Sequence, residues 1–220
     1  MVTLKFPALH NALQKSMHDV DPLDVKSGVY VYSNRAYVLQ DDFLLICNLY
    51  DYFTIEGGVE TDEQLKGLNK VLSYLNGKVI SKALWTEFTK EYVMKVENDK
   101  LSLHSEGYVK DYKIFPSTVK ATGMFNRVKT VISKELCAIQ SLSLPMASFN
   151  FIYSTLKKTF NSEHIIFEFC GQANAVKFTF RKRKHIYGYI IPHYDSANEE
   201  FKFEDFNTIC EELNPQTTQG

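Results

Sequence analysis

An amphipathic helix followed by a series of short strands recurs along this chain, and few folds accommodate that repetition. The first helix begins at Pro7, a residue favoured at the first helical position, and runs to about Val20 with apolar residues at helical spacing on one face. The pattern starts again at Thr61, an N-cap candidate whose next two residues are acidic. Because strands joined by short turns pair antiparallel, we predict an α+β fold in which helices pack on antiparallel sheets.

The periodicity predicts four helices, which cover residues 7–20, 61–76, 124–139 and a segment from about Ser148. Strands are expected at residues 3–6, 29–33, 36–40, 43–53, 79–88, 91–96, 101–105, 108–115, 142–146, 164–170, 175–181 and 185–192. The last helix is expected to bury Phe149, Ile152, Leu156 and Phe160, with Asn150, Ser154, Lys157 and Asn161 on the opposite face. Trp85 is expected in the core.

The charge of the chain is unevenly distributed. The whole sequence has 25 Lys and Arg against 26 Asp and Glu, a formal net charge of −1. Residues 196–220 hold six acids and one base, so the rest of the chain carries a net charge of +4. This acidic segment is either a solvated tail or a segment that competes with a polyanion or docks a partner.

The polar faces of the helices carry lysine or arginine, and Glu135 is the only acid in a middle turn. A lysine on one exposed helical face is usually just solvated. The same bias on four helices favours a shared basic surface, the footprint of phosphate-backbone contact without base reading.

Sequence motifs for catalysis and metal binding are missing. The chain has no GxGxxG, GxxxxGK[ST], HExxH or GxSxG motif, and its six histidines and four cysteines do not cluster at metal-ligand spacing. Asp41 and Asp42 lie between two predicted strands, where adjacent acids usually form a turn. We therefore predict a non-enzymatic protein without catalytic residues, metal or cofactor, and rank an enzyme with a dispersed site well below this.

The sequence also shows no signal peptide and no apolar run long enough to cross a bilayer, which predicts a cytoplasmic protein. Cys137 and Cys170 lie in apolar surroundings and are expected to be small core residues.

The densest basic run, residues 181–184, lies between two strongly predicted strands. It is expected to be a hairpin loop, solvated or in contact with nucleic acid phosphates, rather than a nuclear import signal.

Residues 149–156 open with Phe-Asn and an apolar run, and residues 187–192 contain tyrosine and aliphatic residues and end in proline. These two stretches resemble the DNA sliding clamp family. In the closing unit of those clamps, a helix that opens with Phe-Asn and an apolar run precedes a meander ending in tyrosine, aliphatic residues and proline. The first half, which ends in Ile114-Phe115-Pro116, resembles one complete domain of the two-domain, phage-type clamps.

The resemblance implies a clamp-like domain I at residues 1–117, an abbreviated clamp-like domain II at residues 118–195 and an acidic tail at residues 196–220. The second domain is abbreviated because the chain shows three meanders, whereas two clamp domains contain four. An unusual clamp, a clamp-derived regulator and a partner-dependent half-ring all fit this shortfall.

The function that the resemblance implies is that of a DNA polymerase processivity factor, which encircles or cradles duplex DNA without reading its sequence. It implies a homo-oligomer, a trimer or a dimer, that tethers DNA polymerase and a clamp loader in the cytoplasm of the host of a phage, virus or mobile element. The cations placed against DNA are Lys15, Lys66, Lys70, Arg127, Lys129, Lys134, Lys157 and Lys158. The positions that match the apolar partner groove, for which the other interpretation is plain core, are Ile114, Phe115, Tyr189, Ile191 and Pro192. The alternative function is an α+β protein-interaction module that never touches DNA.

Overall fold

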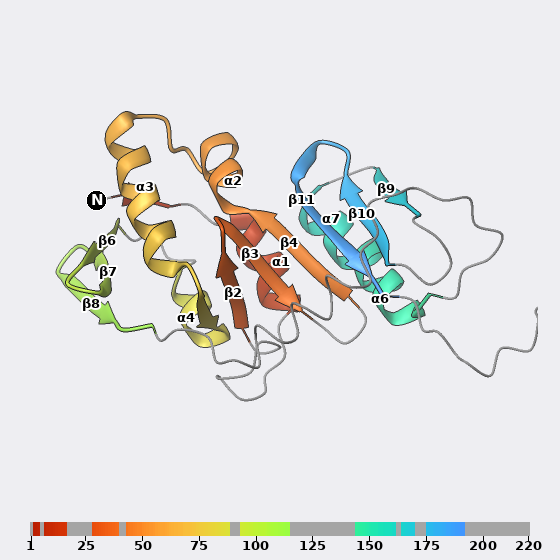
Figure 1. Cartoon of the computed structure of the whole chain (residues 1–220), viewed down its shortest axis with the longest axis horizontal. Coiled ribbons are helices and arrows are strands. Elements are labelled where there is room, and N and C mark those ends of the chain that lie inside the picture. Colours follow the sequence, from red (N-terminus) through yellow and green to blue (C-terminus); the bar gives the residue numbers. More distant parts are fainter. Residues whose placement is uncertain are drawn as a thin grey trace, which may run out of the picture.

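The computed structural model describes residues 2–4, 7–16, 28–39, 43–88, 93–114, 144–161, 164–169 and 175–191. Within them two antiparallel sheets lie along the long axis, with the smaller sheet near one end and β9 near the other (Figure 1). The larger sheet has the spatial order β5 (Lys78–Ser81), β2 (Gly28–Tyr32), β3 (Arg35–Leu39), β4 (Phe43–Asn48), β11 (Arg183–Ile190), β10 (Val176–Phe180) and β9 (Ile165–Glu168). The smaller sheet has the order β1 (Val2–Thr3), β6 (Val93–Glu97), β7 (Lys100–Ser105) and β8 (Tyr108–Tyr112). The predicted α+β class with antiparallel sheets is confirmed.

Two short strands interlock the sheets in the first half of the chain. β1 pairs with β6, which places Val2 opposite Met94. β5 pairs with β2, which places Ile80 opposite Val29. Each short strand therefore joins a meander distant in sequence, and the chain passes from the smaller sheet to the larger one after β1 and back again after β5.

The first and last parts of the chain meet within the larger sheet, where β4 pairs with β11. The register places Leu45 opposite Gly188. A Cβ at Gly188 would overlap both the ring of Phe178 and the carbonyl oxygen of Leu44. The close approach of β4 and β11 therefore depends on a residue without a side chain.

The helical segments of the described residues are α1 (Pro7–Ser16), α2 (Leu49–Ile55), α3 (Asp62–Leu75), α4 (Lys82–Glu87), α6 (Met146–Asn150), η2 (Phe151–Leu156) and α7 (Lys157–Thr159). α3 begins with a capping box, in which the Thr61 hydroxyl accepts from the Gln64 amide and the Gln64 side chain accepts from the Thr61 amide. α6, η2 and α7 follow one another without a break, and η2 is a π-helical segment with wider turns. Within the described ranges, no helix has the length and apolar character needed to cross a membrane.

The predicted strand 43–53 ends early, because its residues from Leu49 onward form α2. Asn48 caps this helix by accepting a hydrogen bond from the amide of Asp51. Tyr52 and Phe53 are each 1% exposed. These aromatic residues, which suggested a strand, therefore belong to a helix and are buried in the core.

The predicted strand 79–88 is also wrong in its second part. Residues from Lys82 form α4, and Ser81 caps it by accepting from the Leu84 amide. Trp85 lies on this helix and is buried, as predicted. The described part of the predicted strand 142–146 contains no strand, since Met146 begins α6.

Other predicted features lie outside the described residues. They are the end of the first helix at residues 17–20, Asp41 and Asp42, the helix at 124–139 with Cys137, Cys170, and the tail at 196–220.

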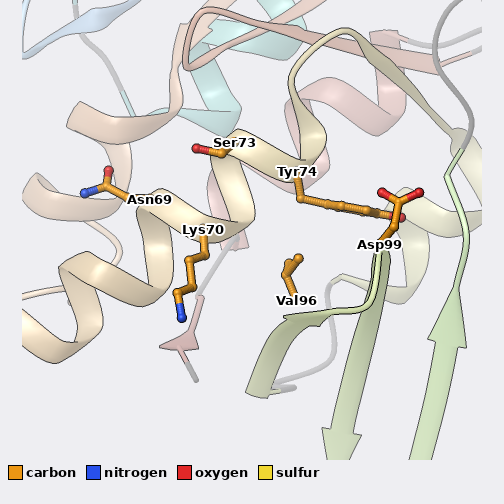
Figure 2. A pocket seen from close by; sticks show the side chains of 6 residues that line it. All are labelled: Asn69, Lys70, Ser73, Tyr74, Val96 and Asp99. Atoms are coloured by element: carbon orange, nitrogen blue, oxygen red, sulfur yellow. The ribbon is translucent and has the colours of Figure 1, made fainter.

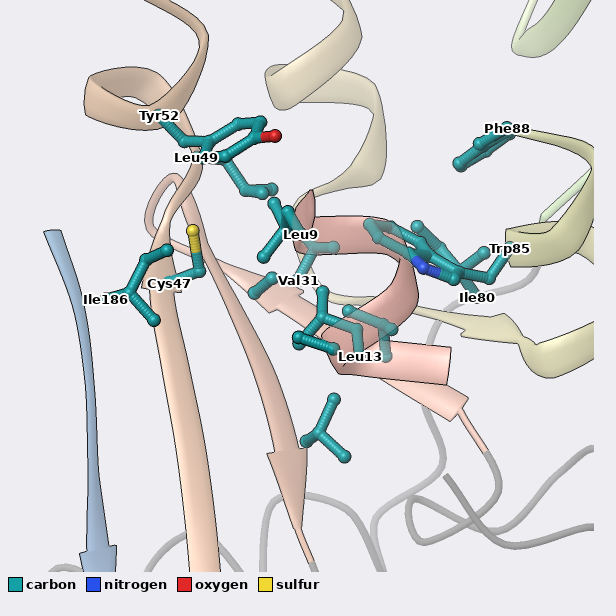
Figure 3. Close-up of a cluster of buried hydrophobic side chains, with 14 of the residues drawn as sticks. Leu9, Leu13, Val31, Cys47, Leu49, Tyr52, Ile80, Trp85, Phe88 and Ile186 are labelled. Carbon is teal, nitrogen blue, oxygen red and sulfur yellow. The ribbon is translucent and has the colours of Figure 1, made fainter. Parts of the chain in front are cut away.

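The main core lies between the helices and one face of the larger sheet (Figure 3). Leu9 and Leu13 of α1 pack there with Val31 of β2 and are fully buried. The same contiguous cluster includes Ile152 of η2 and Ile186 of β11. The helices of both halves therefore rest on one continuous sheet and share one core.

The opposite face of the larger sheet carries a second, shallower cluster. Its members come from strands alone within the described residues: Tyr30, Leu44 and Ile46 are buried, and Tyr37, Val79, Tyr187 and Tyr189 pack against them. The ring of Tyr32 stacks on that of Tyr30 with centroids 6.2 Å apart. We call Tyr30, Tyr32, Tyr37, Tyr187 and Tyr189 the tyrosine face.

Candidate nucleic-acid interface

A groove of about 340 Å³ lies between α1 and the continuous η2–α7 segment. α1 and α7 are in contact beside the larger sheet (Figure 1). The lining residues are Asn11, Lys15, Ser154, Thr155, Lys158 and Thr159. No carboxylate is among these described residues. Two ammonium groups, three hydroxyls and an amide therefore converge, and groups of these kinds bind phosphate oxygens.

The amphipathic pattern of each helix places the lysines at this groove. On α1, Leu9, Ala12 and Leu13 are buried against the sheet, which leaves Lys15 exposed. Lys15 also lies in the last turn of α1, where the helix dipole favours a cation. On the other side, Lys158 is exposed in α7.

The face of the η2–α7 segment that lies toward α1 determines which side chains line the groove. Ser154, Thr155, Lys158 and Thr159 line it, and their spacing of three and four residues places them on one face of the helix. The Lys157 ammonium instead lies over the ring of Tyr153, with Nζ 4.7 Å from the ring centroid. Lys157 therefore lies beside the groove without lining it.

Phe149 is not the core residue that the helical pattern predicts. It is 37% exposed and stacks on Phe167 of β9 with ring centroids 5.6 Å apart. Ser148 is buried in that turn instead. The other three predicted positions, Ile152, Leu156 and Phe160, are buried as expected.

Lys66 and Lys70 lie exposed on α3, which contributes no residue to the α1–α7 groove. Lys70 lines a separate hollow of about 600 Å³ between α3 and the β6–β7 hairpin. Figure 2 shows Lys70 projecting from the helix while Asp99 lies beside the ring of Tyr74. Asp99 pairs with Lys78 at 3.7 Å, and the Lys78 ammonium lies 3.2 Å from the centroid of the Tyr74 ring. Because this hollow contains a carboxylate, it is less suited to phosphate than the α1–α7 groove.

Lys78, which pairs with Asp99 of this second hollow, has a shifted pKa. Burial lowers the pKa of Lys78 from its usual value, although the neighbouring Asp99 acts in the opposite direction. The remaining predicted DNA contacts, Arg127, Lys129 and Lys134, lie outside the described residues.

The residues matched to the partner groove fall in different places. Ile114 is buried in the main core, and its amide donates to the Tyr74 hydroxyl at 3.1 Å. Tyr189 belongs to the cluster on the other face of the sheet, and Ile191 is half-buried after β11. The structure thus does not bring Ile114 and Tyr189 into one groove. Phe115 and Pro192 lie outside the described residues.

The basic run at residues 181–184 is only partly a loop. β11 already begins at Arg183, whose Nη2 lies 3.2 Å from a carboxylate oxygen of Glu56 and whose guanidinium lies over the ring of Phe160. His185 Nε2 lies 2.8 Å from the other Glu56 oxygen. Arg183 is therefore held against Glu56 at the end of α2 and the ring of Phe160, whereas the other three cations of the run are exposed.

Apart from Tyr189, the residues of the tyrosine face were not among the sequence-predicted site residues, and neither were the threonines of the groove. A signal for the tyrosine face is present, because tyrosine occupies every second position at Tyr30 and Tyr32 and again at Tyr187 and Tyr189. The groove has no comparable signal, since its lining residues belong to two segments far apart in the sequence. In the described part of the chain, no cluster of three or more His, Cys, Asp or Glu side chains could hold a metal ion.

The architecture matches that of bacterial DNA polymerase III beta clamps. The structure superposes on pol III beta from Caulobacter crescentus with a TM-score of 0.54 and 8% sequence identity, over 88% of this chain and 66% of that chain. It superposes on the DNA polymerase sliding clamp from Bacillus subtilis with a TM-score of 0.51 and 9% identity, over 88% of this chain and 64% of that chain. The chain has the sliding-clamp fold over most of its length.

This likeness is one of fold alone, because the sequences share so few residues. The sequence matches no protein-family model and no curated protein. The chain also spans slightly less than two thirds of the length of these clamps. The predicted clamp fold is confirmed, while the division at residues 117 and 195 stays a prediction.

Proposed function

We propose that this chain is a sliding-clamp-like processivity factor, which encircles or cradles duplex DNA without reading its sequence and tethers DNA polymerase. The observation that carries the proposal is the α1–α7 groove, where Lys15 and Lys158 converge with hydroxyl and amide groups and no carboxylate. Contacts to phosphate supply affinity that is independent of sequence, as sliding requires. The clamp fold over 88% of the chain supports the same function.

The other cations of the proposed DNA surface are secondary to this groove. Lys157 borders it, while Lys66 and Lys70 belong to α3. Arg127, Lys129 and Lys134 complete the proposed set.

The proposed organisation is a clamp-like domain at residues 1–117, an abbreviated clamp-like domain at residues 118–195 and an acidic tail at residues 196–220. The proposed source is a phage or virus, whose protein acts in the host cytoplasm.

The test replaces the two groove lysines in one variant, Lys15→Ala with Lys158→Ala. Binding to duplex DNA is measured by fluorescence anisotropy over a series of salt concentrations, with several unrelated sequences. Losing two phosphate contacts should weaken binding equally for every sequence and reduce the slope of log K against log salt by about 2.

The matched control is Lys100→Ala, which removes an exposed lysine at the start of β7 in the smaller sheet. This control should bind as the wild type does. Equal weakening in both variants would indicate a general charge effect, and an unchanged slope in the Lys15 and Lys158 variant would refute the groove as the DNA contact.

The proposal includes self-association into a dimer or trimer. Among the described residues, β8 and β9 are outer strands of the two sheets, and Val109 and Ile166 on them are 60% and 44% exposed. Such open edges pair readily with strands of another chain. We expect β8 of one copy to pair with β9 of the next, and a Val109→Lys variant to shift the solution mass measured by light scattering toward the monomer. A wild type that is monomeric at every concentration would contradict this part.

The proposed partners are DNA polymerase and a clamp loader, which would dock near Ile114, Phe115, Tyr189, Ile191 and Pro192.

The alternative function, a protein-interaction module without DNA binding, is favoured by one specific observation: the half-buried aromatic cluster on the sheet face opposite the groove. A strict monomer that ignores DNA but binds protein would support the module. A salt-sensitive, oligomeric DNA binder would support the clamp.

A further inference from the structure

The tyrosine face extends as a continuous ladder across the larger sheet. The strand registers place Val79 opposite Tyr30, Tyr30 opposite Tyr37, Tyr37 opposite Ile46, and Ile46 opposite Tyr187. Neighbouring rings contact one another, with 6.2 Å between the centroids of Tyr187 and Tyr189. A broad aromatic surface therefore lies on the side of the sheet opposite the α1–α7 groove.

Arg35 is a cation within this surface. Arg35 is opposite Tyr32 on one side and Asn48 on the other. The electrostatic interaction with Tyr187 raises the pKa of Arg35, and a side-chain hydrogen bond with Tyr37 acts in the same direction. Among the described residues, no carboxylate forms an ion pair with Arg35. A ligand that fits this face therefore offers apolar or aromatic side chains together with negative charge.

The sequence that follows β11 has this composition. Residues 199–213, which we call the acidic segment, contain six Asp and Glu and one Lys. Its apolar side chains are Phe201, Phe203, Phe206, Ile209 and Leu213. Aromatic rings and carboxylates thus alternate over a few residues, which matches the rings and the guanidinium of the tyrosine face.

The acidic segment is also connected closely enough to reach this face. It follows β11, the strand that carries Tyr187 and Tyr189, and ten residues separate Ile190 from Phe201. An extended chain of that length spans roughly 33 Å at about 3.3 Å per residue. β2 is three strands from β11, or about 15 Å at the usual strand spacing of about 4.8 Å. The segment can therefore cover Tyr30 and Tyr32 within the same molecule.

We propose that the acidic segment docks on the tyrosine face of its own chain, with its phenylalanines on the tyrosine rings and its carboxylates at Arg35. This inference is independent of the proposed function, because it requires neither DNA binding nor a ring.

The test measures the solvent accessibility of single tyrosines in the full-length protein by hydroxyl-radical footprinting and mass spectrometry. Tyr32 is 51% exposed on the sheet itself, and Tyr153 of η2, at 58%, serves as the internal reference away from the face. In the wild type we expect Tyr32 to be labelled several-fold more slowly than Tyr153. The substitutions Phe201→Ala, Phe203→Ala and Phe206→Ala together should bring the two rates close to each other, and Arg35→Glu should act in the same direction.

The matched control carries three alanines outside the acidic segment, at Asn214, Gln216 and Thr217, and should keep Tyr32 protected. Equal labelling of Tyr32 and Tyr153 in the wild type would overturn the proposal. If Tyr32 stays protected in the variant with Phe201→Ala, Phe203→Ala and Phe206→Ala, something other than the acidic segment shields Tyr32. That result would also overturn the proposal. Protection that grows with protein concentration would assign it to a second copy, whereas docking within one chain predicts no dependence on concentration.

Discussion

Replacing Gly188 by alanine tests the junction at which β11 joins β4. The added Cβ would lie 2.6 Å from Cε1 of Phe178, and closer still to the end of that ring and to the carbonyl oxygen of Leu44. Carbon atoms at optimal separation are about 3.5 to 4.0 Å apart, so the ring must move by roughly 1 Å. Phe178 is fully buried, and the backbone of Leu44 is held by the pairing of β4 with β11. Neither group can therefore move away from the new Cβ without a loss of stability.

Overpacking of a core usually costs about 1 to 3 kcal/mol. We expect Gly188→Ala to cost about 3 kcal/mol, near the upper end, because one of the two obstructing groups is backbone. In a chain of this length such a loss lowers the melting temperature by roughly 10 °C. It should also be visible in urea unfolding as a lower midpoint with an unchanged slope.

A double-mutant cycle with Phe178→Leu separates the clash from other effects. Leucine removes the outer part of the ring, so the double variant should be more stable than the sum of the single losses by about 1 kcal/mol or more. Lys184→Ala, at an exposed position on the same strand, is the control and should change the free energy of unfolding by less than about 0.5 kcal/mol. A clash at Gly188 is refuted if Gly188→Ala unfolds like the wild type, or if the two substitutions are simply additive.

Three further predictions concern hydroxyl groups. Burial raises the pKa of Tyr52 from 10.0 to about 12. The contribution of this hydroxyl to the free energy of unfolding is therefore present below pH 10 and is lost as the pH rises toward 12. Tyr52→Phe should remove up to about 3 kcal/mol of that alkaline loss in unfolding titrations. The Tyr74 hydroxyl accepts from the buried amide of Ile114, and Tyr74→Phe should cost about 2 kcal/mol in urea unfolding, while a cost near zero would show that the amide finds another partner. Thr61→Ala removes the capping box with Gln64 and should cost about 1 kcal/mol, with Thr61→Ser restoring most of it in the same measurement.

Much of the fold could be predicted from the sequence because its periodicities are strong. The apolar stripe of α3 and its N-cap at Thr61 both follow from local rules, and α3 forms as expected. The error at α2 has an equally local origin. Tyr52 and Phe53 suit a strand by propensity, and the capping hydrogen bond from the Asp51 amide to Asn48 starts a helix instead.

The candidate site was less predictable, because it depends on tertiary structure. Lys15 and Lys158 are far apart in sequence and meet only where α1 contacts α7. Lys158 lines the groove, whereas the Lys157 ammonium lies over the ring of Tyr153, and this difference depends on which face of α7 packs toward α1. The tyrosine face could have been found from its alternation, but only the pairing of β4 with β11 joins its two parts into one surface.

That pairing also links the two proposed surfaces. On β11, Ile186 and Ile190 face the core that contains η2 and thereby support Lys158, while Tyr187 and Tyr189 complete the tyrosine face on the other side. A disturbance of the β4–β11 junction should therefore affect both surfaces at once. In Gly188→Ala we expect weaker DNA binding together with faster labelling of Tyr32, whereas the Lys15 and Lys158 variant should weaken DNA binding and leave the labelling unchanged. If the junction variant changed only one of these properties, the two surfaces would not depend on one shared strand.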